Sequence, residues 1–257
     1  MDNSDANIET SFSGILEGLT AFYASLKKVT AEIDAAMPKI VSTLEAVGKM
    51  AIWFRVVEKL TEKQIVFTDD LTADLACEWE DKKDISIAVE DYYYTLGHIR
   101  QLIDRVGKDK AMESYYMFYS EIVECSKRQH YQLACIGMFA LLDGVLSDLT
   151  DMVSTNYNKR INKIEETVRK NEELTVLDRK LLCVYKGIKA ASNSMFCGVD
   201  FKGSETKLLN RNWLQHGRTH RTYNRMDFLK ALLFLDGILF FAEQGNTTKS
   251  QIEEEKT

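Results

Sequence analysis

The chain contains several long stretches in which apolar residues return every three or four positions. Because an α-helix makes one turn in 3.6 residues, this spacing gathers apolar side chains on one face of a helix. Runs of this kind cover residues 8–63 and 177–191, and the clearest extends from Tyr131 to Thr150. Its apolar stripe consists of Tyr131, Ala134, Cys135, Met138, Leu142, Val145, Leu146 and Leu149. The pattern predicts an all-α protein built as a multi-helix bundle.

Short polar or charged segments separate the expected helices. Asp84 is expected to cap a helix that begins near Ile85 and ends near Val106, and a further helix is expected over residues 110–126. Residues 155–175 are dense in Lys, Arg, Glu and Asn. Such a composition favours an exposed helix or arm, so this segment is predicted to be solvated.

The most apolar segment, residues 228–242, is also predicted to be a helix. It contains Lys230 and Asp236 and is shorter than the roughly 20 apolar residues that cross a bilayer, so we expect a buried helix and no membrane partner. Its apolar character extends around all sides of residues 229–241. Either a homodimer interface or a fully enclosed central helix would explain this.

Composition agrees with a helical protein of a reducing compartment. With 13 glycines and one proline among 257 residues, the chain lacks the turn residues that an all-β protein needs. The five cysteines are scattered and form no C-x2-C pair, so we expect no metal site and no cofactor. The acidic N-terminus lacks the features of a signal peptide, which favours a cytoplasmic location. A net charge of −6 argues against a broadly basic, non-specific nucleic-acid-binding surface.

Candidate chemistry lies near the C-terminus, where residues 208–217 read Leu-Leu-Asn-Arg-Asn-Trp-Leu-Gln-His-Gly. Arg211 and His216 stand five positions apart, with Asn212 after the arginine and Gly217 after the histidine. The spacing of the arginine and the histidine is weak by itself, since chance placement often produces such a pair. The flanking residues make the signal more specific.

The segment 208–217 resembles the C-terminal motif of HEPN-domain ribonucleases. The segment from Tyr131 to Gly144 resembles an earlier core helix of the same family, in which a Tyr-x-x-Ala start leads to an acidic residue followed by glycine. The resemblance covers roughly residues 113–245. We therefore divide the chain into an N-terminal helical region of unassigned role, residues 1–110, and an HEPN-like domain, residues 111–257.

This resemblance implies an all-α homodimer in which the arginine and the histidine of each chain meet in a cleft and cleave RNA without a metal. Such domains often act as toxins or antiviral defence effectors on RNA or tRNA, which also implies an inhibitory or activating protein partner. On this basis Arg211 holds the scissile phosphate, His216 transfers a proton, and Asn212 orients the arginine or the phosphate. A guanidinium offers a permanently charged fork to phosphate oxygens, and imidazole titrates near neutral pH.

Helix geometry restricts how Arg211 and His216 can cooperate. Residues five positions apart on a straight helix point about 140° away from one another. Either Arg211 lies at the start of its helix, where the backbone can turn it inward, or the working pair is assembled between two copies of the chain. The sequence leaves both alternatives open.

The region around the motif is basic in an acidic protein. Between Lys207 and Lys230, six basic residues face the single acidic Asp227, a net charge of +5. An RNA-gripping edge would have this character, with Trp213 and Tyr223 available for base stacking. Four further residues of this edge are expected to bind RNA: Arg218, His220, Arg221 and Arg225. In the alternative, these arginines pair with the acidic N-terminal half of the chain as a structural face.

Asp143, which precedes Gly144 and lies off the apolar stripe, is a candidate to support Arg211, although an acidic residue on a helix is usually solvated. Two functional interpretations remain. The first is a metal-independent endoribonuclease of the HEPN type. The second is a non-catalytic helical module that binds protein or RNA, in which His216 is a core or capping residue and Arg211 forms an ordinary ion pair.

Overall fold

A computed structural model describes residues 41–68, 70–154, 156–169 and 177–254, together with the single residues 25, 27, 28, 32 and 37. The chain separates into two compact units, residues 1–51 and 52–257. In the first unit, residues 41–51 are helical and solvent-exposed. The second unit contains residues on both sides of position 110, and one apolar core joins them. The assignment of residues 111–257 to an HEPN-like domain stays a prediction.

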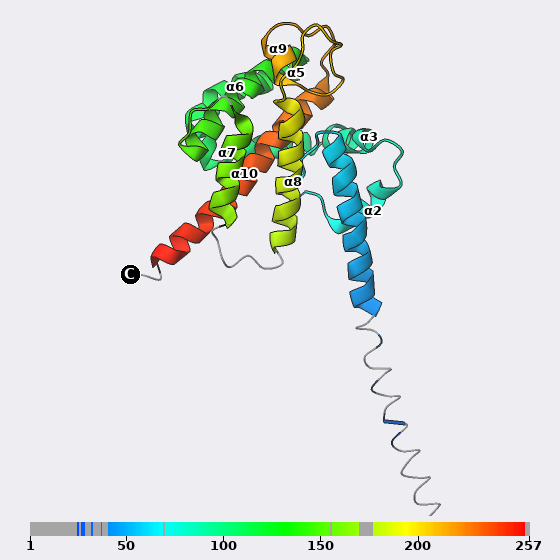
Figure 1. Ribbon diagram of the computed structural model, residues 1–257. Coiled ribbons are helices and arrows are strands. Elements are labelled where there is room, and N and C mark those ends of the chain that lie inside the picture. The colour runs from blue at the N-terminus through cyan, green and yellow to red at the C-terminus, as the bar shows by residue number, and fades with distance from the viewer. Residues whose placement is uncertain are drawn as a thin grey trace, which may run out of the picture. The chain divides into compact units, whose positions relative to one another are not determined.

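All regular elements of the described residues are helices, which confirms the all-α class (Figure 1). Residues 52–62 are helical at the start of the second unit. The elements that follow are α2 (Ala73–Glu80), α3 (Ile85–Glu90), the π-helical turn η1 (Asp91–Thr95), α4 (Ile99–Lys108), the 3-10 turn η2 (Lys110–Tyr115), α5 (Tyr116–Lys127), α6 (Tyr131–Thr150), α7 (Tyr157–Arg169), α8 (Leu177–Met195), α9 (Arg211–Gln215) and α10 (Arg225–Glu254).

The sequence pattern predicted both ends of α6, but only the start of α3. Helix α6 begins and ends where its apolar stripe does. Asp84 caps α3 as expected, since its carboxylate accepts a hydrogen bond of 3.0 Å from the backbone N–H of Ser86. The single helix predicted as far as Val106 is wrong, because the chain leaves helical geometry after η1 and Gly97 takes a φ of +84°. Glycine adopts this left-handed conformation without the steric cost that a Cβ atom brings.

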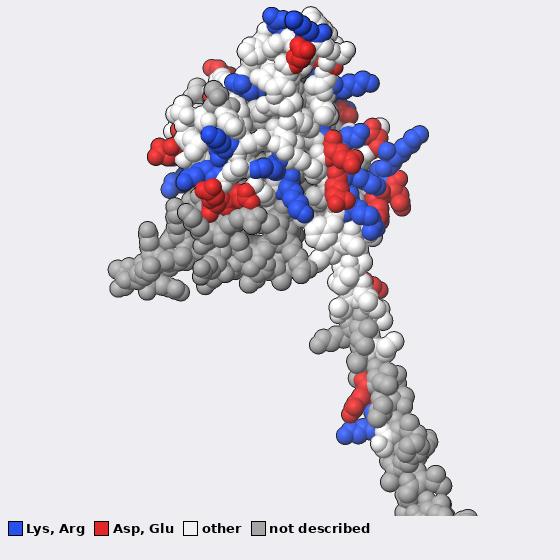
Figure 2. Space-filling model, in the orientation of Figure 1, with Lys and Arg blue, Asp and Glu red and all other residues white. Residues whose placement is uncertain are grey.

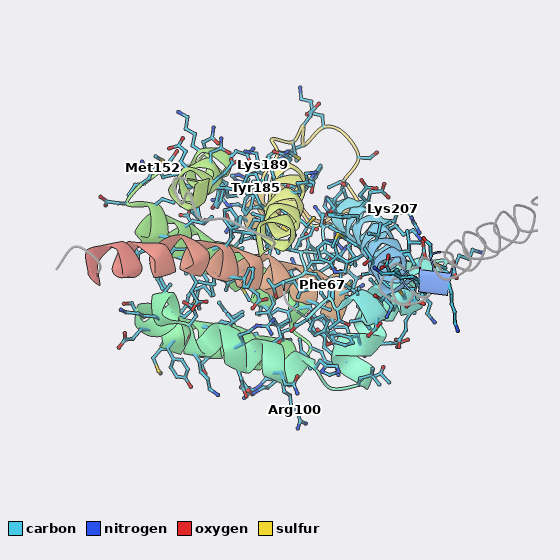
Figure 3. The ribbon with its side chains drawn as sticks, turned by 90° about the horizontal axis from the view of Figure 1, so that it is seen from below. Phe67, Arg100, Met152, Tyr185, Lys189 and Lys207 are labelled. Carbon is cyan, nitrogen blue, oxygen red and sulfur yellow. The ribbon has the colours of Figure 1, made fainter. Side chains whose placement is uncertain are left out.

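Charged side chains of both signs lie between uncharged areas on the face of the second unit that Figure 2 shows. Side chains of both signs also lie at the end that carries α9. Arg100 of α4 points away from the ribbon, whereas Phe67 lies among the helices (Figure 3). Phe67 is buried and Arg100 is exposed.

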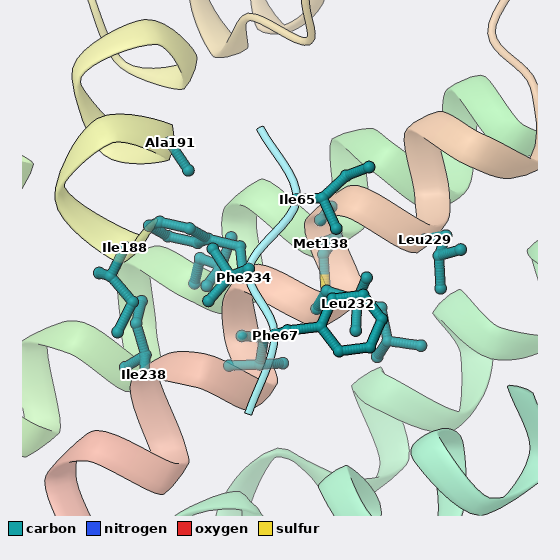
Figure 4. Close-up of a cluster of buried hydrophobic side chains, with 14 of the residues drawn as sticks. Ile65, Phe67, Met138, Ile188, Ala191, Leu229, Leu232, Phe234 and Ile238 are labelled. Carbon is teal, nitrogen blue, oxygen red and sulfur yellow. The ribbon is translucent and has the colours of Figure 1, made fainter. Parts of the chain in front are cut away.

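Helix α10 is the centre of the core. Its residues from Phe228 to Phe234 contribute buried side chains on every side, except for the partly buried Lys230, and α4, α6, α7 and α8 pack around it. Figure 4 shows Leu229, Leu232 and Phe234 beside side chains from α6, α8 and the segment after residue 62. Of the two explanations for its apolar character, enclosure within one chain is therefore sufficient. By length and composition, α6 is the one described helix that could cross a membrane, but half of its apolar window is buried in this fold.

Helix α7 corrects the prediction that residues 155–175 are solvated. Tyr157, Arg160, Ile161 and Ile164 are all buried against the rest of the unit. The three apolar residues recur at helical spacing, and this short stripe is enough to dock a helix whose remaining positions are mostly polar or charged. Residues 155 and 170–176 lie outside the described part of the chain.

Ionic hydrogen bonds tie α10 to the first segments of the second unit. The guanidinium of Arg105 binds the carboxylate of Asp70 through two bonds of 2.9 Å. It also binds the buried carboxylate of Asp236 at 2.8 and 2.9 Å, and the hydroxyl of Thr68 donates to the same carboxylate at 2.9 Å. A cavity of about 80 Å³ lies beside Thr68, Arg105 and Asp236. These contacts fix α4 against α10.

Gly237 lets the segment at Val66 approach α10 closely, and substitution of this glycine is expected to destabilise the fold. A Cβ atom at this position would lie 2.6 Å from a methyl carbon of Val66. We expect Gly237→Ala to lower the free energy of unfolding by about 1–3 kcal/mol, the usual cost of overpacking. Urea denaturation followed by circular dichroism measures this. Gly48→Ala, where nothing lies within 4 Å, is the control and is expected to lose no stability. Equal stability of Gly237→Ala and wild type would contradict the packing.

Candidate functional site

The segment that leads into α9 is fixed by two buried amides. The side-chain amide of Gln64 donates to the carbonyl of Leu209 at 2.9 Å and accepts from the N–H of Leu209 at 2.8 Å. Asn210 caps the helix, since its side-chain oxygen accepts hydrogen bonds from the N–H groups of Asn212 and Trp213. A capping asparagine satisfies donors that have no partner within the first turn. Gln64 therefore fixes the backbone just before α9, and Asn210 fixes the first turn of the helix.

Arg211 occupies the first position of α9, which is the helix-start geometry that the sequence allowed. The helix spans five residues, so Arg211 and His216 lie at its opposite ends. His216 follows the last helical residue, and Gly217 then turns the chain with a φ of +64°. The arginine is thereby free to turn inward from the helix start.

The side chain of Arg211 lies over Tyr157 of α7. Its guanidinium carbon is 5.3 Å from the centre of the Tyr157 ring, within the range of a cation–π contact. The Nε atom of Arg211 is buried and has no hydrogen-bond partner among the described residues. The positive charge therefore packs on an aromatic ring, and one of its donors is left unused.

Asp143 of α6 is the carboxylate of this cluster, and Arg160 holds it in place. Its Oδ1 atom accepts from Arg160 at 2.5 Å and from the hydroxyl of Tyr157 at 2.8 Å. Arg160 also donates to the carbonyl of Asp143 at 2.8 Å and to the hydroxyl of Ser147 at 2.9 Å. Arg160 is 1% exposed, whereas the side chain of Asp143 is 51% exposed. The buried Arg160 thus holds Asp143 in place, while the other side of the Asp143 carboxylate faces solvent.

The charges around Asp143 keep it ionised. Partial burial by itself would raise the pKa of Asp143, but hydrogen bonds from Arg160 and Tyr157 and the charges of Arg160 and Arg211 outweigh it and lower the pKa. Burial and the hydrogen bond to Asp143 raise the pKa of Tyr157 to about 12. Arg211 thus acts on Asp143 through its charge, whereas the Asp143 carboxylate accepts its hydrogen bonds from Tyr157 and Arg160. The supporting role of Asp143 stays a prediction, and the interaction of Asp143 with Arg211 in this geometry is one between charges.

Asn212 is occupied in holding the loop between α8 and α9. Its side-chain amide donates a hydrogen bond of 2.8 Å to the carbonyl of Cys197. The neighbouring Asn210 donates to the carbonyl of Ser194 at 3.1 Å. The amide of Asn212 therefore fixes the loop, which differs from the predicted contact with Arg211 or a phosphate.

His216 is exposed and lies against Phe201 of the same loop. The two rings meet edge to face with centres 5.5 Å apart. The guanidinium of Arg218 lies 5.0 Å from the centre of the Phe201 ring. Neither His216 nor Arg218 is buried, so both remain accessible to a ligand. His216 is therefore not a core residue, although its backbone closes α9.

Of the remaining members of the predicted RNA-binding edge, Arg221 and Arg225 form ion pairs within the fold and His220 is exposed. Arg221 binds Asp227 through bonds of 2.9 and 3.0 Å, and Arg225 pairs with Glu90 at 2.5 Å. These are the pairings of the structural alternative, although Asp227 belongs to α10 and not to the N-terminal half. His220 is exposed, and its backbone N–H binds a carboxylate oxygen of Glu205 at 2.7 Å.

The two rings expected to stack on bases are buried. Trp213 is 5% exposed and Tyr223 is 6% exposed. Trp213 packs edge to face with Phe201, and Tyr223 is covered by the guanidinium of Arg221 at 4.0 Å. Neither ring presents a face to a base in this structure. The prediction of a stacking role for these two residues is corrected accordingly.

Four residues of this region escaped the sequence analysis. Tyr157 and Arg160 were counted with a charged segment, and only the docking of α7 brings them beside Arg211 and Asp143. Gln64 lies far from the motif in sequence. Phe201, between two glycines of a loop, carried no periodic signal. No group of three or more His, Cys, Asp or Glu side chains in the described ranges is placed to hold a metal ion.

Comparisons of the chain with protein-family models, with curated proteins and with solved structures gave no match.

Removal of Asp143 is expected to lower the stability of the fold more than removal of Arg160. Asp143→Ala leaves the charge of Arg160 buried without its carboxylate, and we expect the free energy of unfolding to fall by about 3 kcal/mol. Arg160→Met leaves a carboxylate that is half exposed and can be hydrated, so we expect a smaller loss. Urea denaturation of both variants and of the double variant measures the difference. A larger loss for Arg160→Met would contradict this assignment.

The contribution of Asp143 is also expected to depend on pH. Because the folded state lowers the pKa of Asp143, ionisation stabilises the fold above the ordinary aspartate pKa of about 3.9, and this stabilisation is lost as the pH falls through the lowered value. The stability difference between wild type and Asp143→Ala should therefore be constant from pH 5 to 7 and shrink in more acidic solution. A difference that grows on acidification would show that Asp143 is not held as an anion.

Proposed function

We propose that the protein is a metal-independent endoribonuclease of the HEPN type. The observation that carries this proposal is the state of Arg211, whose guanidinium lies at the start of α9 with a buried donor that has no partner among the described residues. The exposed imidazole of His216 at the other end of α9 adds to it. The resemblance of residues 131–144 and 208–217 to this family supplies the reaction class.

In this proposal Arg211 binds non-bridging oxygens of the scissile phosphate, because a guanidinium offers parallel donors to an oxyanion. His216 accepts the proton of the ribose 2′-hydroxyl as its oxygen forms a bond to phosphorus, and the bond from phosphorus to the 5′-oxygen breaks. A second proton donor neutralises the leaving oxygen. Acid–base assistance of this kind is worth about 10²- to 10⁴-fold in rate.

A second copy of the chain is part of the proposal. Within one chain Arg211 lies over Tyr157, whereas His216 lies against Phe201. A homodimer would allow Arg211 of one copy and His216 of the other to act on the same phosphate. RNA or tRNA as the substrate, a cytoplasmic toxin or antiviral effector role, and an inhibitory or activating protein partner belong to the same proposal.

The proposal predicts RNA cleavage that depends on both residues. Purified protein in EDTA is incubated with total RNA and with tRNA, and products are separated by gel electrophoresis. We expect cleavage by wild type, and a loss of about 10²-fold or more in Arg211→Ala and His216→Ala, since each removes a group that acts on the reacting phosphate. Equal cleavage by wild type and both variants would reject the assignment and indicate a contaminating nuclease.

Matched controls are available on the same molecule. Arg100→Ala removes an exposed guanidinium that points away from the helices (Figure 3). His130→Ala removes an exposed imidazole before α6. Both variants are expected to cleave like wild type. Thermal unfolding of all four variants separates a loss of chemistry from a loss of folded protein.

A non-catalytic helical module that binds protein or RNA is the second candidate. It is favoured by the engagement of Asn212, Arg221 and Arg225 in contacts within the fold, and by the burial of Trp213 and Tyr223. It predicts no cleavage of either RNA by wild type or by any of the variants. The measurements described above therefore distinguish the two candidates.

A further inference from the structure

Phe201 lies at the centre of a small aromatic and cationic cluster next to the candidate catalytic histidine. Its ring packs edge to face on the buried Trp213, with ring centres 5.2 Å apart, and on His216 at 5.5 Å. The guanidinium of Arg218 lies 5.0 Å from the ring centre. Phe201 is partly exposed, and His216 and Arg218 are exposed. The cluster therefore combines a fixed aromatic ring with two accessible nitrogen-bearing side chains.

These three side chains suit an unpaired nucleobase. Bases of single-stranded RNA stack on aromatic side chains and on arginine planes, and a positive charge beside the ring attracts the phosphodiester backbone. Trp213 anchors Phe201 from the buried side, which limits the rearrangement that binding would require. Bases in a duplex are stacked on one another, so their faces are not available to such a cluster.

We propose that Phe201, His216 and Arg218 form a binding site for one unpaired base of single-stranded RNA. The identity of the ligand as RNA rests on the proposed function. In the homodimer of the proposed function, His216 acts on the phosphate that Arg211 of the other copy holds. Because Phe201 contacts His216, the base bound at Phe201 lies close to that phosphate, and the enzyme selects unpaired RNA.

The experiment measures binding without cleavage. A short 2′-O-methyl oligoribonucleotide lacks the attacking hydroxyl, and a matched series has each base in turn removed to leave an abasic position. Fluorescence anisotropy with the full chain gives the dissociation constant for each probe. We expect wild type to bind one abasic probe about 5- to 100-fold more weakly than the intact probe, the range that base–aromatic stacking produces. The duplex form of the probe should bind more weakly than the single strand.

Substitutions at Phe201 separate stacking from packing. Phe201→Leu keeps an apolar side chain on Trp213 but removes the ring, so we expect weaker binding of the intact probe and equal binding of intact and abasic probes. Phe201→Tyr keeps the ring and should retain the discrimination. Tyr92→Ala is the matched control, because Tyr92 is also partly exposed and contacts both a buried tryptophan and a histidine. It should bind like wild type.

The outcomes are distinct from those of the cleavage assay. Retained discrimination in Phe201→Leu, or no discrimination by wild type, overturns the base site whether or not RNA is cleaved. Discrimination that depends on Phe201 supports the base site even if wild type cleaves nothing, in which case only the ribonuclease proposal fails. Absence of binding by wild type overturns the base site directly.

Discussion

The burial of α10 is the constraint on which the rest of the second unit depends. A helix that is apolar on all sides is unstable in water until other helices cover every face, and each fully buried large side chain contributes about 1.5–3 kcal/mol. Helices α4, α6, α7 and α8 provide this cover. Gly237 and the segment at Val66 show how close the approach is. Because α6, α7 and α8 must meet α10, the loop and short helix that follow α8 are carried to one end of the bundle (Figure 1).

Buried polar groups then decide the details, because each must find a partner. Gln64 binds both backbone groups of Leu209 and so sets where the chain enters α9. Arg160 joins α7 to α6 through Asp143 and Ser147. The Nε atoms of Arg160, Arg211 and Arg221 are all buried without a partner in the described part of the chain. Arg160 and Arg221 bind carboxylates through their terminal nitrogens, whereas the guanidinium of Arg211 makes no hydrogen bond or ion pair with the described residues. This difference is the physical basis for treating Arg211 as a ligand-binding residue.

The C-terminal region carries fewer unpaired positive charges in the folded structure than its sequence suggests. Counting residues 207–230 gives a net charge of +5, but Glu90 and Glu205 lie outside that window and approach its arginines in the fold. Arg221 and Arg225 are thereby neutralised, and Arg211 and Arg218 remain without an ion pair among the described residues. Those two arginines lie over rings, of Tyr157 and Phe201 respectively. The candidate site therefore consists of two separate arginine–aromatic contacts, Arg211 with Tyr157 at the start of α9 and Arg218 with Phe201 beyond its end.

Sequence periodicity by itself determined the all-α class, the bounds of α6, the cap of α3 at Asp84 and the buried character of α10, because these depend on contacts within one helix or on total apolar content. The tertiary structure decided which charged and aromatic residues are available. Arg160 is buried although it belongs to a segment rich in charged residues, Trp213 is buried and therefore not available to a base, and Phe201 takes the partly exposed place beside His216. A helical repeat records which face of a helix is apolar, but it does not record which other helix, loop or carboxylate that face will meet.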